Sequence, residues 1–150
     1  MRFAYQGYPV SGVGSSRLQV VYRPVIPIRL IGPGGDASSY GLLDTGADDT
    51  LLPLRLAAAL GVEIKPAMRA RIVGIGGVAM TADFVTIDLE LGRRNTFYRW
   101  SATVGFYDGF KTILGQSGVL EFFLASFNHR AKVATLQPDG KLPLPLHTAP

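Results

Sequence analysis

The chain has 150 residues, 47% of them hydrophobic, which is enough to bury one core and makes a second domain unexpected. Its net charge is +4. It holds no cysteine, and this absence excludes disulfides, a thiolate nucleophile and cysteine-ligated metals. No apolar stretch reaches about 18 residues and the first residues lack an apolar leader, so we expect a soluble cytoplasmic protein without a membrane partner.

The first third of the chain predicts an extension followed by strands. The 18 glycines and 10 prolines that separate short apolar runs are typical of a β-rich protein. Residues 1–16 form an N-terminal extension for which three roles stay open: an edge strand, a cover over the neighbouring core, or a mobile segment. Residues 17–23 alternate, and we expect a half-buried strand with Leu18, Val20 and Tyr22 on its inner face.

A predicted hairpin comes next. Residues 25–31 lie among prolines, and because proline cannot donate to a ladder, we expect an edge strand or a strand that begins outside the sheet. A turn over residues 32–36 then leads into a strand over residues 39–43, which ends at Asp44. Residues 54–60, between a proline and a glycine, predict a short helix that packs beneath this strand end.

Asp44 stands between two aliphatic runs, in the string Leu42-Leu43-Asp44-Thr45-Gly46. Burying an ionised carboxylate without partners is costly, so such an acid is usually hydrogen-bonded at a turn or shares a proton with a second acid. Thr45 supplies a hydroxyl for a local hydrogen bond, and Gly46 can adopt a positive φ. Both interpretations of Asp44 remain open from the residues alone.

The second half predicts hairpins. Residues 69–84 form one with an apolar, glycine-rich tip, and the glycines there are not a nucleotide-binding loop, because neither a Lys-Ser/Thr pair nor a helix follows. Residues 83–91 and 100–106 alternate as partner strands around a turn at residues 92–96. The predicted inward residues are Val85, Ile87, Leu89 and Leu91 on the first strand and Trp100, Ala102, Val104 and Phe106 on the second. The remaining predicted elements are a buried strand at 112–115, a helix around 119–124, a hairpin over 127–136 and a disordered tail at 137–150.

Three segments resemble a known family. The string from Leu42 to Thr50, with Asp44-Thr45-Gly46-Ala47-Asp48-Asp49 at its centre, resembles the active-site segment of retropepsins, the single-domain aspartic proteases of retroviruses and their cellular and bacterial relatives. Val73-Gly74-Ile75-Gly76-Gly77 resembles the flap of that family, and Thr112-Ile113-Leu114-Gly115 resembles the element before the C-terminal helix. The resemblance spans about residues 24 to 136.

The resemblance implies an all-β fold, a closed acid-protease β-barrel with one or two short helices, assembled as a C2 homodimer. The protease domain would cover residues 17–136. Asp44 would be catalytic, and Thr45 would support the loop by a hydrogen bond across the dimer. Gly46 would support the loop and contact the substrate through its carbonyl, and Gly115 would let the chain pass close behind the loop. The implied substrate-binding residues are Gly46, Ala47, Asp48, Asp49, Val73, Gly74, Ile75, Gly76, Gly77 and Val78.

The chemistry of the family explains the expected homodimer. Two facing carboxylates share one proton and activate a water, because like charges about 3 Å apart cannot both ionise. The chain has one Asp-Thr-Gly triplet and no internal repeat, so the second acid is expected from a second copy. No cofactor or metal is implied. Gln116 departs from the family, which usually carries an arginine there that pairs with the acid at Asp48; Arg17 or Arg23 could substitute.

Other functions have weaker signals. A non-catalytic dimeric module could bind an extended peptide in the same groove, but a binder has no use for an acid pair. The basic and aromatic run at residues 93–99 is a solvated turn rather than a nucleic-acid site. Asp44, Asp48 and Asp49 are poor metal ligands together, because neighbouring residues of a strand point to opposite faces. His129 lies in a predicted turn, exposed to solvent.

Overall fold

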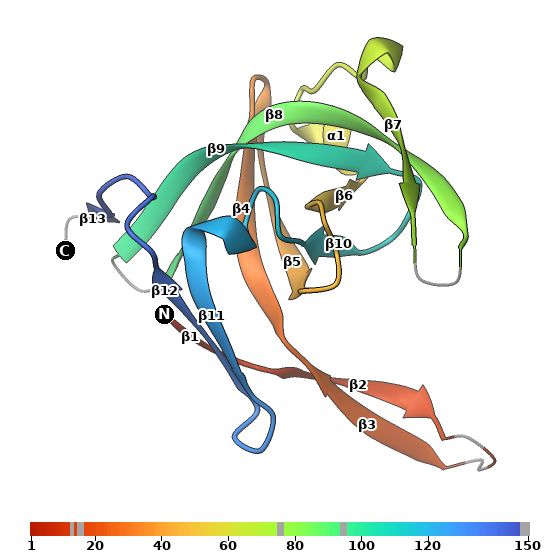
Figure 1. Ribbon diagram of the computed structural model, residues 1–150, viewed down its shortest axis with the longest axis vertical. Helices are drawn as coiled ribbons and strands as arrows, with labels where there is room; N and C mark the ends of the chain where they lie inside the picture. The colour runs from red at the N-terminus through yellow and green to blue at the C-terminus, as the bar shows by residue number, and fades with distance from the viewer. Residues whose placement is uncertain (13, 15–16, 75–76, 94–95, 148–150) are drawn as a thin grey trace.

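The computed structural model describes residues 1–12, 14, 17–74, 77–93 and 96–147, and it is mainly β (Figure 1). The strands are β1 (Arg2–Ala4), β2 (Gln6–Ser11), β3 (Leu18–Arg23), β4 (Val25–Gly32), β5 (Gly35–Leu43), β6 (Leu51–Pro53), β7 (Arg69–Val73), β8 (Ala79–Arg93), β9 (Thr96–Tyr107), β10 (Thr112–Leu114), β11 (Phe123–Asn128), β12 (Val133–Pro138) and β13 (Leu146–His147). The helical pieces are α1 (Leu56–Ala59) and the 3-10 turns η1 (Pro66–Met68) and η2 (Leu120–Phe122).

Six strands close into a barrel in the order β9-β6-β10-β5-β4-β8, and the pairing of β8 with β9 completes the ring. β10 runs parallel to β5, and β6 runs parallel to β9. β13 extends the ring outward beside β9, while β7 pairs with the start of β8 as a hairpin that projects from the barrel (Figure 1). The all-β barrel expected from the sequence is therefore confirmed.

The barrel core follows the alternation of its two longest strands. Ile87 and Leu89 of β8 are buried, as are Trp100 and Val104 of β9, so the predicted inward faces are confirmed. Residues directly opposite on antiparallel strands share a face, and the register Leu89↔Trp100 sets these side chains against each other. Burial of large apolar side chains on both strands supplies the main stabilisation of the ring.

The prediction of an edge strand at residues 25–31 is wrong, because β4 lies between β5 and β8. Ile26 and Leu30 of this strand are fully buried. Pro27 is tolerated because the ladder with β8 covers only Arg29 to Ile31, so nothing on that side requires an N–H from residue 27. The other expectation, a strand that begins outside the sheet, is also wrong, because β4 pairs with β5 from Val25 onward.

The first residues do not extend freely from the barrel. β1 pairs with β12 in a three-stranded sheet ordered β1-β12-β11, and Phe3 is buried there, which matches the edge-strand role among the three left open. β2 and β3 pair only with each other. The prediction that residues 17–23 form a half-buried strand is wrong in its burial: Leu18 and Val20 are 72% and 57% exposed.

The C-terminal part differs from the expected pattern in two places. The predicted helix at 119–124 is only the turn η2, because Phe123 already belongs to β11 and packs edge-on against Trp100 with ring centroids 5.7 Å apart. Residues 137–147, expected as a disordered tail, include the end of β12 and the strand β13, which pairs with β9. Among the described residues, no helix is both long and apolar enough to cross a membrane.

Candidate active site

Asp44 directly follows the last residue of β5, a barrel strand that lies between β10 and β4. Its backbone N–H donates to the Leu114 carbonyl at 3.1 Å, and its own carbonyl accepts from the Ala47 N–H at 3.3 Å. The Gly46 N–H donates to carboxylate Oδ1 at 3.0 Å. The carboxylate is therefore held at a tight turn, as one of the two sequence interpretations required, and it is partly open to solvent.

A second loop, residues 115–118, lies behind the Asp44 loop, which we define as residues 44–50 between β5 and β6, and is hydrogen-bonded to it. The backbone N–H groups of Gln116 and Ser117 donate to the carbonyls of Ala47 and Asp48, each at 2.8 Å. The Gln116 side-chain Nε2 also donates to the Thr45 carbonyl at 2.9 Å. Gln116 thus binds the backbone of the Asp44 loop rather than an acidic side chain. From the sequence, Gln116 was identified only as a departure from the family, and its contact with the Asp44 loop was not predicted.

Thr50 is a supporting residue that sequence reasoning missed. It is fully buried, its hydroxyl donates to the Ser117 carbonyl at 2.8 Å, and the Gly115 N–H donates to that hydroxyl at 3.2 Å. A buried hydroxyl with both its donor and its acceptor capacity used joins the two loops. The available signal was a polar residue directly before the buried aliphatic strand β6.

Gly115 lies so close to the Asp44 loop that no side chain fits. An added Cβ would lie 2.3 Å from the Asp49 carbonyl oxygen and 2.8 Å from that of Ala47, well inside contact distance. Both neighbours are backbone atoms and cannot rotate away. The chain passes close behind the loop at this position, as the resemblance implied.

The acids beside Asp44 do not gather around it. Asp48 is exposed and Asp49 is partly buried, with a backbone bridge to Ser117. In the part of the chain that the structure describes, no cluster of three or more His, Asp or Glu side chains could hold a metal ion. Asp48 and Asp49 therefore contribute backbone to the loop architecture, and Asp44 alone is held by its carboxylate.

The flap-like hairpin consists of β7, the start of β8 and the tip between them. At the tip, Gly74 N–H donates to the Val78 carbonyl at 3.0 Å, and Gly77 has φ of +75°, a conformation that favours glycine. Val73 and Val78 are mostly exposed, so the hairpin presents apolar side chains to solvent. Ile75 and Gly76, also expected in the flap, lie outside the described residues.

The base of this hairpin is held by an ion pair. Arg69 of β7 donates to the buried Asp83 of β8 through Nε at 2.9 Å and through its second nitrogen at 3.1 Å. These hydrogen bonds raise the pKa of Arg69. Within the described residues, the hairpin makes no hydrogen bond to the Asp44 loop, so it is attached to the barrel through β8.

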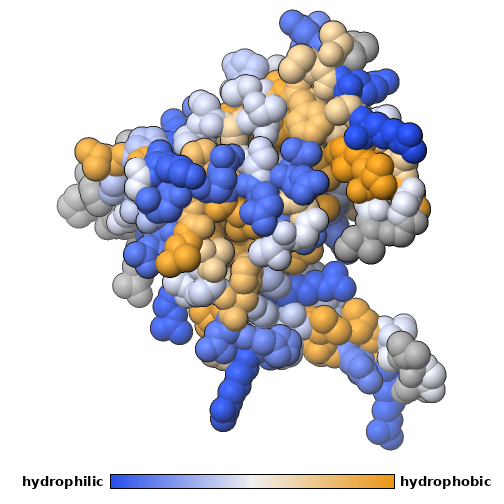
Figure 2. All heavy atoms as spheres, viewed as in Figure 1, coloured by the Kyte–Doolittle hydropathy of each residue, from blue (hydrophilic) through white to orange (hydrophobic). Residues whose placement is uncertain are grey.

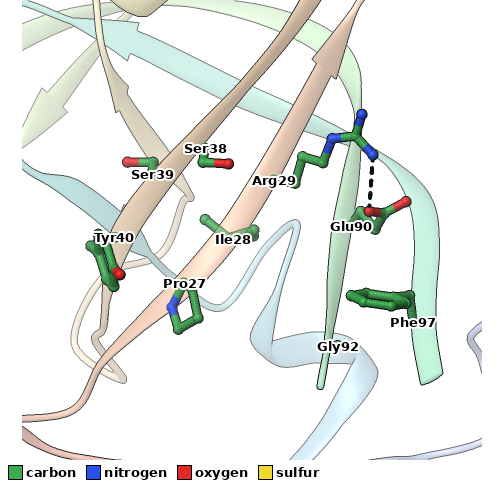
Figure 3. A pocket seen from close by; sticks show the side chains of 9 residues that line it. All are labelled: Pro27, Ile28, Arg29, Ser38, Ser39, Tyr40, Glu90, Gly92 and Phe97. Carbon is green, nitrogen blue, oxygen red and sulfur yellow. Dashed lines mark hydrogen bonds and ion pairs between the residues drawn. The ribbon is translucent and has the colours of Figure 1, made fainter. Parts of the chain in front are cut away.

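A hollow of about 320 Å³ lies elsewhere, on the outer face of β4, β5, β8 and β9 (Figure 3). Arg29 and Glu90 form an ion pair at 3.3 Å along its wall, with Tyr40 and Phe97 on opposite sides. None of its lining residues belongs to the Asp44 loop or the flap-like hairpin. Its charged groups are already paired, so we assign no chemistry to it.

Comparison with known proteins identifies the family of the chain. Residues 31–117, more than half of the chain, match the family model described as aspartyl protease. A solved structure titled as EIAV protease complexed with the inhibitor HBY-793 is similar, with 22% identity, a TM-score of 0.45, and coverage of 63% of this chain and 82% of that chain. Among curated proteins no match is found. The matched range contains Asp44, its loop, the flap-like hairpin and residues 115–117 of the loop behind Asp44, and the chain belongs to the aspartyl protease family.

Proposed function

We propose that the chain is an aspartic endopeptidase that hydrolyses peptide bonds as a C2 homodimer. The observation that carries the proposal is the state of Asp44. Its loop is fixed by backbone hydrogen bonds and by Gln116, yet its carboxylate is partly open to solvent. A rigidly held, accessible carboxylate is suited to meet a second acid and a water molecule.

Homodimer formation completes the catalytic pair. The chain has one Asp-Thr-Gly triplet, and a two-fold axis beside Asp44 would bring two copies of it face to face. One carboxylate would stay protonated while the other takes a proton from the attacking water. The protonated acid would then donate to the scissile carbonyl oxygen as the tetrahedral intermediate forms. Thr45, which is exposed next to Asp44, would contact the partner loop.

An extended peptide would lie between the Asp44 loop and the flap-like hairpin. The carbonyl of Gly46 and the backbone of Ala47, Asp48 and Asp49 would bind the peptide backbone from one side. From the other side, Gly74 and Gly77 would let the hairpin tip approach closely and exclude water, with Val73 and Val78 against apolar side chains of the substrate. The exposed apolar residues of the hairpin support this role.

The test is cleavage of an unstructured protein such as reduced casein over the pH range 3 to 8. Wild-type chain should cleave with a rate that rises and then falls with pH, because the pair needs one protonated and one ionised acid. Asp44→Asn should abolish cleavage and keep the fold. Asp108→Asn, which changes an exposed acid in the turn after β9, is the matched control and should retain wild-type turnover.

The second part of the test mixes wild-type chain with the Asp44→Asn variant. Excess Asp44→Asn chain should suppress the wild-type activity, because mixed dimers hold one ionisable acid. An Asp44→Asn variant with wild-type turnover would show that Asp44 is not catalytic. Specific activity that does not change on dilution, together with no suppression in mixtures, would contradict the shared site.

A further inference from the structure

The strands β2 and β3 form an arm that extends away from the barrel (Figure 1). We define the arm as residues 6–11 and 18–23. Each strand has six residues, so at about 3.3 Å per residue the arm reaches roughly 20 Å. Figure 2 shows hydrophobic side chains exposed along it. Neither strand pairs with another sheet of the structure.

One face of the arm is apolar and flat. Leu18, Val20 and Tyr22 alternate along β3 and are 72%, 57% and 43% exposed. Their register partners on β2 include Pro9 and Gly7. A Cβ added at Gly7 would lie 2.9 Å from a methyl of Val20 and 3.4 Å from the Tyr22 ring, so both side chains lie across the glycine. The third partner, Ser11 opposite Leu18, is polar, so the apolar part of this face is formed mainly by the β3 side chains.

A two-stranded arm of this kind is stabilised when its apolar face packs against another surface. An isolated two-stranded hairpin is marginally stable in water, because it has no hydrophobic layer on either face. Here Val21 on the opposite face is also 39% exposed, so the barrel of the same chain covers neither face fully. Contiguous exposed apolar residues on an ordered element mark an interaction site.

The root of the arm lies beside the candidate active site. Only Pro24 separates β3 from β4, and the Pro24 carbonyl accepts the Leu43 N–H at 2.9 Å, one residue before Asp44. At the other strand, the Tyr5 N–H donates to the Lys132 carbonyl at 2.7 Å, and the Lys132 ammonium lies 5.2 Å from the Tyr22 ring centre. The base of the arm is thus fixed next to the surface where a second Asp44 would arrive.

The N-terminal strand leaves little apolar surface for a second copy. β1 is paired inside the protomer with β12, Phe3 is buried, and the N-terminal ammonium donates to the Leu136 carbonyl at 2.6 Å. The loop around Asp44 presents Thr45 and Gly46, which are small. A stable dimer buries about 800 Å² per partner, and small residues at the site supply only part of it.

We propose that the arm clasps the second copy of the chain, with Leu18, Val20 and Tyr22 buried against the partner. The proposal rests on the homodimer of the proposed function. By two-fold symmetry each copy would contribute an arm, so the contact is made twice around one shared site. The arm thereby places the partner's Asp44 loop opposite its own.

Sedimentation velocity of charge variants tests the proposal directly. In Leu18→Glu/Val20→Glu, two exposed residues of the apolar face become charged, so the protomer should fold normally by circular dichroism. Its dimer Kd should rise on the order of tenfold or more, because each dimer contains two altered contacts. Gln19→Glu, on the same strand but the opposite face, is the matched control and should change Kd about twofold at most.

The lack of native cysteine allows a second measurement. A Val20→Cys thiol should react with maleimide more slowly as the protein concentration rises through the dimer Kd. A Leu144→Cys thiol, at a position that is 89% exposed, should react at a constant rate. Concentration-dependent protection at residue 20 alone would support the clasp.

The outcomes separate the clasp from the proposed function. A wild-type dimer whose Kd is unchanged by Leu18→Glu/Val20→Glu overturns the clasp, while peptidase activity that depends on Asp44 would still stand. A dimer weakened by the arm variants but without peptidase activity supports the clasp and contradicts the enzyme. A chain that stays monomeric, or a residue 20 protected at every concentration, would mean that the arm rests on its own barrel or on another protein, and would overturn the clasp.

Discussion

Thr50 and Gly115 are joined by a hydrogen bond in which the glycine N–H donates to the threonine hydroxyl at 3.2 Å. The same hydroxyl donates to the Ser117 carbonyl at 2.8 Å. Thr50 ends the Asp44 loop and Gly115 begins the loop behind it, so one buried hydroxyl fixes the distance between them. The geometry of Asp44 depends on this contact, although neither residue would touch a substrate.

Thr50→Val should therefore destabilise the fold. Valine has nearly the same shape but leaves the Gly115 N–H buried without an acceptor, while the Ser117 carbonyl keeps the Thr50 N–H at 3.1 Å. A buried donor left unpaired costs about 1–3 kcal/mol in the free energy of unfolding. Urea denaturation measures this loss in the free energy of unfolding. The matched control is Thr86→Val. The exposed Thr86 hydroxyl pairs with the Thr103 hydroxyl at 3.1 Å, and its removal should change the free energy of unfolding by less than about 0.5 kcal/mol. Equal losses in both variants would contradict the loop-joining role.

Gly115→Ala should push the two loops apart. The new methyl group would overlap the Asp49 and Ala47 carbonyls, and forced overpacking of this kind costs about 1–3 kcal/mol. Because the strain falls on the Asp44 loop, peptidase activity should fall even at temperatures where the variant is fully folded. Gly74→Ala, where the nearest heavy atom to an added Cβ lies 3.8 Å away, is the control for stability. Calorimetry measures the loss of stability, and the cleavage assay measures the loss of peptidase activity. Wild-type activity in Gly115→Ala would count against the prediction.

Arg69→Gln should loosen the flap-like hairpin. It removes the guanidinium from the buried Asp83 and leaves a carboxylate without its two charge-assisted hydrogen bonds. Amide hydrogen exchange should speed up in β7 and in residues 79–83 of β8, with the barrel strands unchanged. Arg71→Gln, two residues along the same strand and exposed, should leave exchange as in wild type. Faster exchange spread evenly over the barrel would show that the ion pair stabilises the whole fold rather than the hairpin.

Asp36→Asn should change the way in which the stability of the fold depends on pH in the acid range. The hydrogen bond from Arg29 at 3.0 Å, aided by its charge, lowers the pKa of Asp36 below the value of about 4 usual for an aspartate. A carboxyl whose pKa is lower in the folded state contributes stability above about pH 4 and loses it as the pH falls through the folded pKa. The difference in stability between wild type and Asp36→Asn should therefore be constant from pH 5 to 7 and shrink below about pH 4.

Thermal unfolding across pH 2.5 to 7 measures this difference. Asp108→Asn serves again as the exposed control and should give a smaller, flatter difference. A gap between wild type and Asp36→Asn that grows toward low pH would have the wrong sign and would rule out the ion pair as its cause. Both Arg29 and Asp36 are near half exposed, so the effect is small and screened by salt.

The local pattern of the sequence was sufficient for much of the fold. Alternation at Ile87, Leu89, Trp100 and Val104 identified inward faces, because side chains of a strand point to opposite sides in turn and the apolar set must leave water. The turn at Asp44-Thr45-Gly46 was also readable, but the positive φ that the sequence allowed at Gly46 is not found there. The Gly46 N–H instead donates to the Asp44 carboxylate. These inferences need only the neighbours of each residue along the chain.

Tertiary structure decided what depends on distant partners. The alternating run from Leu18 to Tyr22 could not reveal that no layer covers it, because periodicity shows that a strand has an apolar face and not what lies on that face. Pro27 suggested an edge, yet the short ladder with β8 makes its place in the barrel wall compatible with a missing N–H. Thr50 and Gln116 support the Asp44 loop only because the barrel brings residues about 65 positions apart together, and hydrogen bonds across such distances leave no local pattern in the sequence.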